Sequence, residues 1–206
     1  MKTIYLLLLG LLALSHGLFA QRLSPQIGLN MVPLFNKTVE VNATVLRTPG
    51  YEIFLHGGYS FPKFYQTNQN ESYDRYWEGT AGGAYLKLGA RAYWNETGKF
   101  RIYLGPQLTA GYLNQTGKST TVVYCVMAPC PRLEREGKNR QNFLSGGITA
   151  GVTTNIAPRL TLDLGIQANT YVFEKPDLSN TTIYVPGVGR KPVQGVASIQ
   201  YTLKGR

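Results

Sequence analysis

The feature that most constrains this chain is an alternation of apolar and polar residues with a period of two, repeated along most of its length. In the stretch GAYLKLGARAYW, from Gly83 to Trp94, one parity is wholly apolar, whereas the other carries glycine, tyrosine, Lys87 and Arg91. Because successive side chains of a β-strand point to opposite faces, this pattern predicts a strand with two different faces. It raises the question of which solvent each face meets.

The same alternation predicts a series of strands. Six of them begin near Tyr51, Gly83, Phe100, Leu144, Leu160 and Val193. Two further segments, 27–35 and 39–46, alternate in the same way and bring the total to eight. Pro33 cannot donate a ladder hydrogen bond, so it places the first of these segments at a strand end or a sheet edge. With 206 residues and 43% apolar side chains, the chain is expected to form one all-β domain.

The first residues have the layout of a secretory signal peptide. Lys2 precedes a leucine-rich core, and the short side chain of Ala20 precedes Gln21. We therefore expect residues 1–20 to be removed and residues 21–206 to form the mature domain. An uncleaved anchor helix is the alternative, and it is disfavoured because the apolar run is shorter than the roughly 20 residues that span a membrane.

The mature chain would be basic, with 20 of the 21 Lys and Arg side chains kept against 11 Asp and Glu. Such a surplus of positive charge favours binding to nucleic acid or to acidic lipid headgroups, or serves only solubility. Export argues against nucleic acid, and the sequence contains neither a Lys/Arg-rich run nor a nucleic-acid-binding motif.

Apart from the short first outer connection around Asn36 and Lys37, the connections between the predicted strands alternate between short and long. Tight turns are expected at 48–50, 95–99 and 157–159, and long loops at 62–79, 113–142 and 174–191. Short turns at one end and long loops at the other are typical of bacterial outer-membrane proteins. We therefore predict an antiparallel up-and-down transmembrane β-barrel of eight strands.

In such a barrel the apolar parity faces lipid and the polar parity faces a narrow lumen, where charges need partners. Several charged residues fall near the short-turn end on the polar parity: Glu52, Arg91, Arg101, Asp163 and Lys204. Lys87 and His56 follow above them. Because an eight-stranded barrel is just wide enough to be filled by side chains, we predict a charged layer that plugs the lower lumen.

Alternation alone does not tell which face points outward. The alternative is a secreted soluble β-barrel or sandwich with its apolar face inside, binding a small apolar ligand. Two features favour the membrane: the polar parity combines glycine with charges of both signs, and aromatic residues on the apolar parity lie near strand ends. These aromatic residues are Tyr51, Phe61, Trp94, Phe100 and Tyr112, and they resemble an interfacial girdle.

Four stretches carry a resemblance to a known family: the opening QIGLNMVPL, the strands GAYLKLGARAYW and IYLGPQLTAGYL, and the ending VASIQYTLKGR. With them the chain resembles the small eight-stranded outer-membrane β-barrel proteins that are common in Bacteroidota. The resemblance covers nearly the whole mature chain and implies a location in the cell outer membrane. The chain departs from the family at its end, where Lys204, Gly205 and Arg206 follow Leu203 and many such barrels have an aromatic residue.

The two cysteines, Cys125 and Cys130, fall in the longest predicted loop of an exported chain. A local disulfide between them is therefore expected. A zinc site would need further ligands that this loop does not offer, so we expect no metal and no cofactor.

Catalysis on lipids would need a histidine, a nucleophilic serine and an orienting acid near the outer leaflet. His56 and Ser60 share the lumen parity, but no motif places either beside a defined acid. We therefore expect no catalytic residue and a non-enzymatic barrel with a structural, adhesive or surface-binding role through its external loops. A lipid-modifying enzyme is the alternative.

The predicted loop 113–142 is rich in basic residues. They are Lys118, Arg132, Arg135, Lys138 and Arg140, against only Glu134 and Glu136. At the outer end of a barrel these side chains would meet phosphorylated lipid headgroups. We therefore predict that the loop rests on acidic lipid such as lipopolysaccharide, or binds an acidic surface ligand. The alternative is a solvated loop whose charges maintain solubility. As partners we expect outer-membrane lipid alone, with the protein as a monomer.

Overall fold

A computed structural model describes residues 25–70, 75–95, 99–122, 132–173 and 192–203 of the chain. They form the strands β1 (Gln26–Asn30), β2 (Thr38–Arg47), β3 (Tyr51–Asn70), β4 (Arg75–Tyr93), β5 (Phe100–Val122), β6 (Arg132–Ala157), β7 (Leu160–Phe173) and β8 (Val193–Thr202), with the 3₁₀-helix η1 (Val32–Asn36). The predicted signal peptide, the two cysteines and Lys204 lie outside the described residues. Within the described part, no helix has the length and apolar character needed to cross a membrane.

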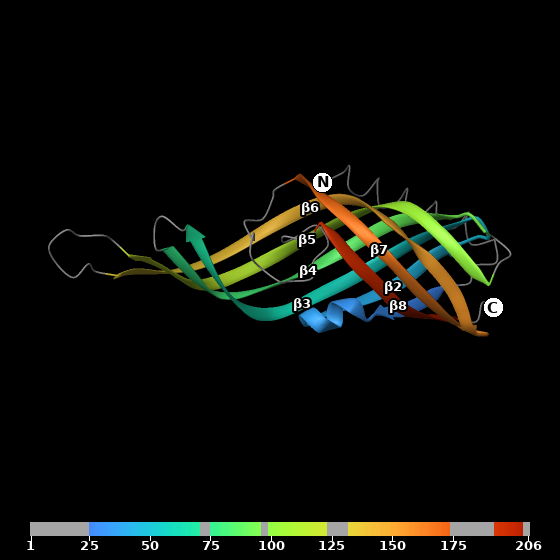
Figure 1. Cartoon of the computed structure of the whole chain (residues 1–206), viewed down its shortest axis with the longest axis horizontal. Coiled ribbons are helices and arrows are strands. Elements are labelled where there is room, and N and C mark those ends of the chain that lie inside the picture. The colour runs from blue at the N-terminus through green and yellow to red at the C-terminus, as the bar shows by residue number, and fades with distance from the viewer. Residues whose placement is uncertain (1–24, 71–74, 96–98, 123–131, 174–191, 204–206) are drawn as a thin grey trace, which may run out of the picture.

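The eight strands form one antiparallel sheet in sequence order that closes into a ring (Figure 1). Closure depends on β1, in which Gln26 lies opposite Thr44 of β2 on one side and Thr202 of β8 on the other. The prediction of an all-β fold with eight strands in up-and-down order is thus confirmed, including the two N-terminal segments.

The first strand is shorter than the sequence indicates. β1 ends at Asn30, and Pro33 lies at the start of η1, where its fixed φ suits a helical first turn and its missing N–H is no loss. Lys37, with φ 54°, then reverses the chain into β2. The prediction of a strand over 27–35 was wrong in its second half, because proline favours the helical turn over a ladder.

The predictions of long loops at 62–79 and 113–142 are also wrong, because strands continue through most of both segments. Pairing between β3 and β4 runs on from Lys63 opposite Ala81 to Asn70 opposite Arg75, after a bulge that follows Ser60. Pairing between β5 and β6 continues to Val122 opposite Arg132. We call these outer parts, residues 63–70, 75–82, 114–122 and 132–140, the extension; it projects past the ring (Figure 1). The third predicted loop, 174–191, lies outside the described residues.

Burial decides which face of the sheet points inward. Lys87 and Arg91 on the polar parity are 1% and 2% exposed, whereas Leu88 between them is 52% exposed. The same division holds on the other strands, where the exposed large apolar side chains include Ile27, Val41, Leu104, Ile148, Leu164 and Ile199. The polar face therefore lines the interior of the ring and the apolar face its outside, which contradicts the alternative arrangement with the apolar face inside.

Candidate functional site

The upper part of the polar interior is organised around Glu40 of β2, which is fully buried. Its carboxylate accepts hydrogen bonds from Lys87 Nζ at 3.1 Å, from Asn30 Nδ2 at 2.9 Å and from the hydroxyl of Tyr85. His56 Nδ1 lies 3.6 Å from the same carboxylate. Because a buried carboxylate without partners is strongly unfavourable, these donors account for its presence inside the ring.

The lower part is organised around Arg91 of β4. Its Nη1 lies 2.8 Å from Asp163 Oδ2 and 3.6 Å from Glu52 Oε1. The guanidinium also lies over the rings of Phe54 and Tyr103, at 4.6 Å and 4.3 Å from their centroids. Arg91 is therefore held by charge on its edge and by aromatic rings on its faces.

Each of the two lower acids also accepts a hydrogen bond from a tyrosine. The hydroxyl of Tyr103 donates to Asp163 Oδ1 at 2.7 Å, and that of Tyr93 donates to Glu52 Oε2 at 2.9 Å. At the rim, Arg47 Nε lies 3.8 Å from Glu52 Oε2, and the guanidinium of Arg101 lies 4.5 Å from the centroid of the Tyr93 ring. The two acids are thus shared between basic and phenolic partners from several strands.

A chain of amides links Lys87, in the upper part, to the opposite wall. Lys87 Nζ donates to Gln167 Oε1 at 2.9 Å, and Gln107 Nε2 donates to Gln167 Oε1 at 3.1 Å and to Asn169 Oδ1 at 2.7 Å. Gln167 in turn donates to Gln194 Oε1 at 3.1 Å. Side chains from β4, β5, β7 and β8 therefore meet across the interior.

Beyond Glu40, towards the extension, the interior becomes apolar. Ala81, Tyr85, Leu113 and Phe143 form a buried cluster, against which Tyr171 packs. Tyr85 belongs to both regions, since its ring lies in this cluster and its hydroxyl reaches Glu40. The interior is therefore filled by charged and polar groups below and by aromatic and aliphatic groups above.

The residues predicted for the charged layer are thus placed as follows. Arg91, Glu52 and Asp163 meet directly, Arg101 lies at their edge, and Lys87 and His56 meet at Glu40. Sequence reasoning did not single out Glu40, Arg47 or the tyrosines. A signal for Glu40 was present, because it lies on the polar parity of segment 39–46 and Lys87 needed an acid.

The structure places both members of the candidate catalytic pair, His56 and Ser60, on the inside of the ring. His56 contacts Glu40 and packs its ring 4.5 Å from that of Phe54, and both His56 and Ser60 are buried in the closed interior. Among the described residues no group of three His, Cys, Asp or Glu side chains could hold a metal ion.

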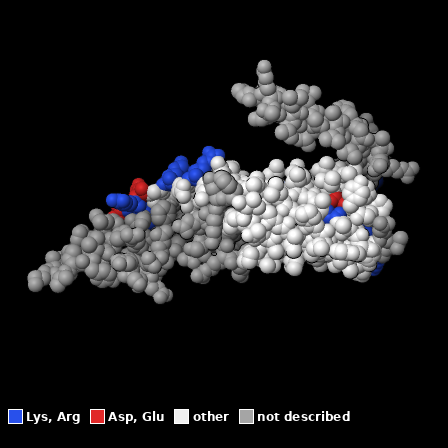
Figure 2. Space-filling model, turned by 90° about the horizontal axis from the view of Figure 1, so that it is seen from above, with Lys and Arg blue, Asp and Glu red and all other residues white. Residues whose placement is uncertain are grey.

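The outside of the ring carries an apolar band bordered by aromatic residues. Near the short turns these are Tyr51, Trp94, Phe100 and Tyr201, and towards the extension they are Phe35, Tyr59, Phe61 and Phe64, all exposed. About ten residues separate the two borders along β3, which at roughly 3.3 Å per residue and a tilt of about 40° spans roughly 25 Å. On the face shown in Figure 2, charged side chains gather over the extension and near the opposite end, and the middle is uncharged.

The basic residues predicted to lie in a loop lie instead on paired strands of the extension. Lys138 and Arg140 share the outward parity of β6, whereas Arg135 has the opposite parity. Lys118 Nζ lies 3.4 Å from Glu136 Oε1, and both side chains are exposed. Arg132 lies opposite Val122 at the end of the described pairing.

No protein-family model matches the chain, and no curated protein sequence matches it. Three features of the molecule bear on its function: its polar interior, its apolar outer band and its basic extension.

Proposed function

We propose that this protein is a small, monomeric outer-membrane β-barrel without enzymatic activity, which spans the membrane through its apolar band and binds surface components through the extension. The observation that carries the proposal is the inverted polarity of the ring. Inside, Glu40 and Asp163 are fully buried; outside, Leu86, Leu88 and Ile166 are more than half exposed. Soluble monomers rarely expose continuous apolar surfaces larger than a few hundred Å².

Three further features support a bilayer as the outer solvent. The band is as tall as the roughly 25 Å apolar band of bacterial outer-membrane barrels, and aromatic residues border it on both sides. Each strand pairs with a neighbour on both sides, so the sheet is closed, as strands in lipid require. Residues 1–20 have the layout of an export signal.

The orientation in the membrane follows from the connections. In outer-membrane barrels the short turns face the periplasm and the long connections face outward. We infer that the turns near Gly50 and Arg159 are periplasmic and that the extension stands outside the cell. The lumen would be plugged by the network around Glu40 and Arg91, so binding at the outer surface is a better-supported role than transport.

The test is fractionation of the full chain, exported by a Gram-negative host. We expect the protein in the outer-membrane fraction, resistant to extraction with alkaline carbonate, and with a gel mobility that changes on boiling. As a matched pair, Leu88→Arg on the apolar face should lower the free energy of unfolding by roughly 2 to 4 kcal/mol, and Lys63→Arg outside the band should leave it nearly unchanged. Recovery of the unmodified protein in the soluble periplasmic fraction would contradict the proposal.

A further inference from the structure

The outward side chains of the extension lie in rows that cross from β4 through β5 to β6. Beyond the aromatic row that contains Tyr112, three rows follow in order: Gly82, Asn114 and Arg140; Thr80, Thr116 and Lys138; Glu78, Lys118 and Glu136. The outward surface thus changes from aromatic to polar within one row. This is the level at which a lipid leaflet changes from acyl chains to headgroups.

Charge is not balanced equally in these rows. In the outermost row Lys118 pairs with Glu136. In the two inner rows, the opposing positions on β4 and β5 carry no acid, and within the described part of the chain neither Arg140 nor Lys138 forms an ion pair. The guanidinium of Arg140 lies 4.7 Å from the centroid of the Tyr112 ring, which fixes its position. Unbalanced positive charge therefore lies directly beyond the aromatic border.

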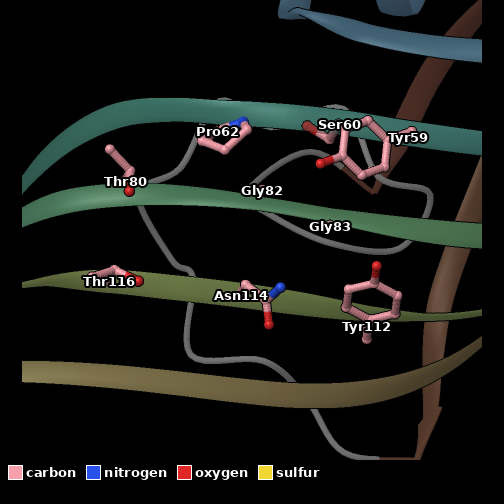
Figure 3. A pocket seen from close by; sticks show the side chains of 9 residues that line it. All are labelled: Tyr59, Ser60, Pro62, Thr80, Gly82, Gly83, Tyr112, Asn114 and Thr116. Atoms are coloured by element: carbon pink, nitrogen blue, oxygen red, sulfur yellow. The ribbon is translucent and has the colours of Figure 1, made fainter.

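A small hollow of about 100 Å³ lies beside these cations. It is lined by Tyr59, Ser60, Pro62, Thr80, Gly82, Gly83, Tyr112, Asn114 and Thr116. Figure 3 shows the rings of Tyr59 and Tyr112 on either side of the Gly82–Gly83 stretch of β4. Position 82 accommodates only glycine, because a Cβ there would lie 2.8 Å from the backbone oxygen of Ser60.

The chemistry of the hollow suits a sugar. Tyr59 and Tyr112 offer ring faces, and Thr80, Asn114 and Thr116 offer hydroxyl and amide groups that donate and accept hydrogen bonds. Tyr112 lines the hollow, and the guanidinium of Arg140 lies over its ring. A ligand bound in the hollow would therefore lie within reach of Arg140.

We propose that this surface, which we call the outer anion site (Lys138, Arg140, Tyr112, Thr80, Asn114 and Thr116), binds the phosphorylated sugar of an outer-leaflet glycolipid. The phosphate is held by Arg140 and Lys138 through charge-assisted hydrogen bonds, and the sugar lies over the hollow. The inference rests on the proposed function, because the extension must stand at the outer leaflet. Among the predicted basic residues whose side chains the structure describes, Lys138 and Arg140 are the two that face outward without an ion pair.

The experiment measures binding of purified lipopolysaccharide to the full chain in phosphatidylcholine vesicles. Lys138→Gln with Arg140→Gln should lower the affinity by about tenfold or more, since both charge-assisted contacts are lost. The control, Arg135→Gln with Lys99→Gln, removes the same charge elsewhere and should change the affinity by less than about twofold. Thr116→Trp, which keeps the charge and fills the hollow, should also weaken binding. Dephosphorylated lipopolysaccharide should bind the unmodified protein as weakly as intact lipopolysaccharide binds the double variant.

Equal losses in the two double variants would overturn the inference, because binding would then follow total charge and not the outer anion site. Unchanged binding in Lys138→Gln with Arg140→Gln would overturn it as well. The change of gel mobility on boiling is measured on the same vesicles. If the unmodified protein inserts and the outer anion site fails, the proposed function stands; if it does not insert, both fail.

Discussion

At the scale of single residues, the interior contains buried acids whose ion-pair and hydrogen-bond partners come from several strands. Asp163 of β7 contacts Arg91 of β4 at 2.8 Å and accepts from Tyr103 of β5 at 2.7 Å, with no exposure to solvent. Replacing it leaves Arg91 with only the more distant Glu52, at 3.6 Å. The buried guanidinium then lacks its closest counter-charge, which is far more unfavourable than losing an exposed pair.

Asp163→Asn, which keeps the shape, is therefore expected to lower the free energy of unfolding by about 3 to 5 kcal/mol. The measurement is urea unfolding in phospholipid vesicles. Glu136→Gln, which breaks the exposed pair with Lys118, is the control and should change stability by less than about 1 kcal/mol. Similar small effects of both substitutions would show that the interior network contributes little to stability.

Two neighbouring glycines of β3, Gly57 and Gly58, provide a second test at this scale. A side chain added at one would point out of the ring, and a side chain added at the other would point into it. A Cβ on Gly58 would lie 2.1 Å from Cζ of the Tyr85 ring, whereas the nearest atom to a Cβ on Gly57 is 4.0 Å away. Gly58→Ala should displace Tyr85 from Glu40 and lower the free energy of unfolding by about 1 to 3 kcal/mol. Gly57→Ala should be close to neutral by the same urea titration. Equal stability of the two variants would contradict the packing of Tyr85 described above.

At the scale of elements, the sequence predicted strands wherever one face differs from the other. The alternation from Tyr51 and from Leu160 marks strands that the structure contains, because a two-sided environment leaves a period of two. Beyond the apolar band both faces of a strand meet polar surroundings, and the alternation fades. For this reason the outer parts of β5 and β6 looked like a loop although they are paired.

Contacts across the interior could be predicted only in part. Parity showed that Lys87, Arg91 and Asp163 share one face, and the distance from the short turns gave their rough level. Which acid meets which base depends on the stagger of strands that are not neighbours in the ring, and the sequence does not encode this locally. Tyrosine adds a further ambiguity, since it suits either face: Tyr85 and Tyr103 point inward, and Tyr59 points outward.

At the scale of the whole molecule, the interior has two successive seals. The lower one is the charged network, in which Arg91 meets Asp163 and Lys87 meets Glu40. The upper one is the apolar cluster that includes Leu113 and Phe143. An ion that crossed the ring would have to break buried charge pairs and then pass an apolar constriction. Since eight strands leave room for little more than side chains, the two seals are expected to act in series.

We therefore expect the unmodified protein to carry no steady ion current in a planar lipid bilayer. Opening the upper seal alone, with Leu113→Ala and Phe143→Ala, should leave the current near zero, because the charged network below still fills the interior. Adding Arg91→Ala with Asp163→Ala and Lys87→Ala with Glu40→Ala removes both buried charge pairs without leaving any of these four charges alone. Current should then appear, provided that gel mobility still changes on boiling. A steady, ohmic current through the unmodified protein would show that the charges line an open pathway; the role of the molecule would then shift from surface binding to permeation.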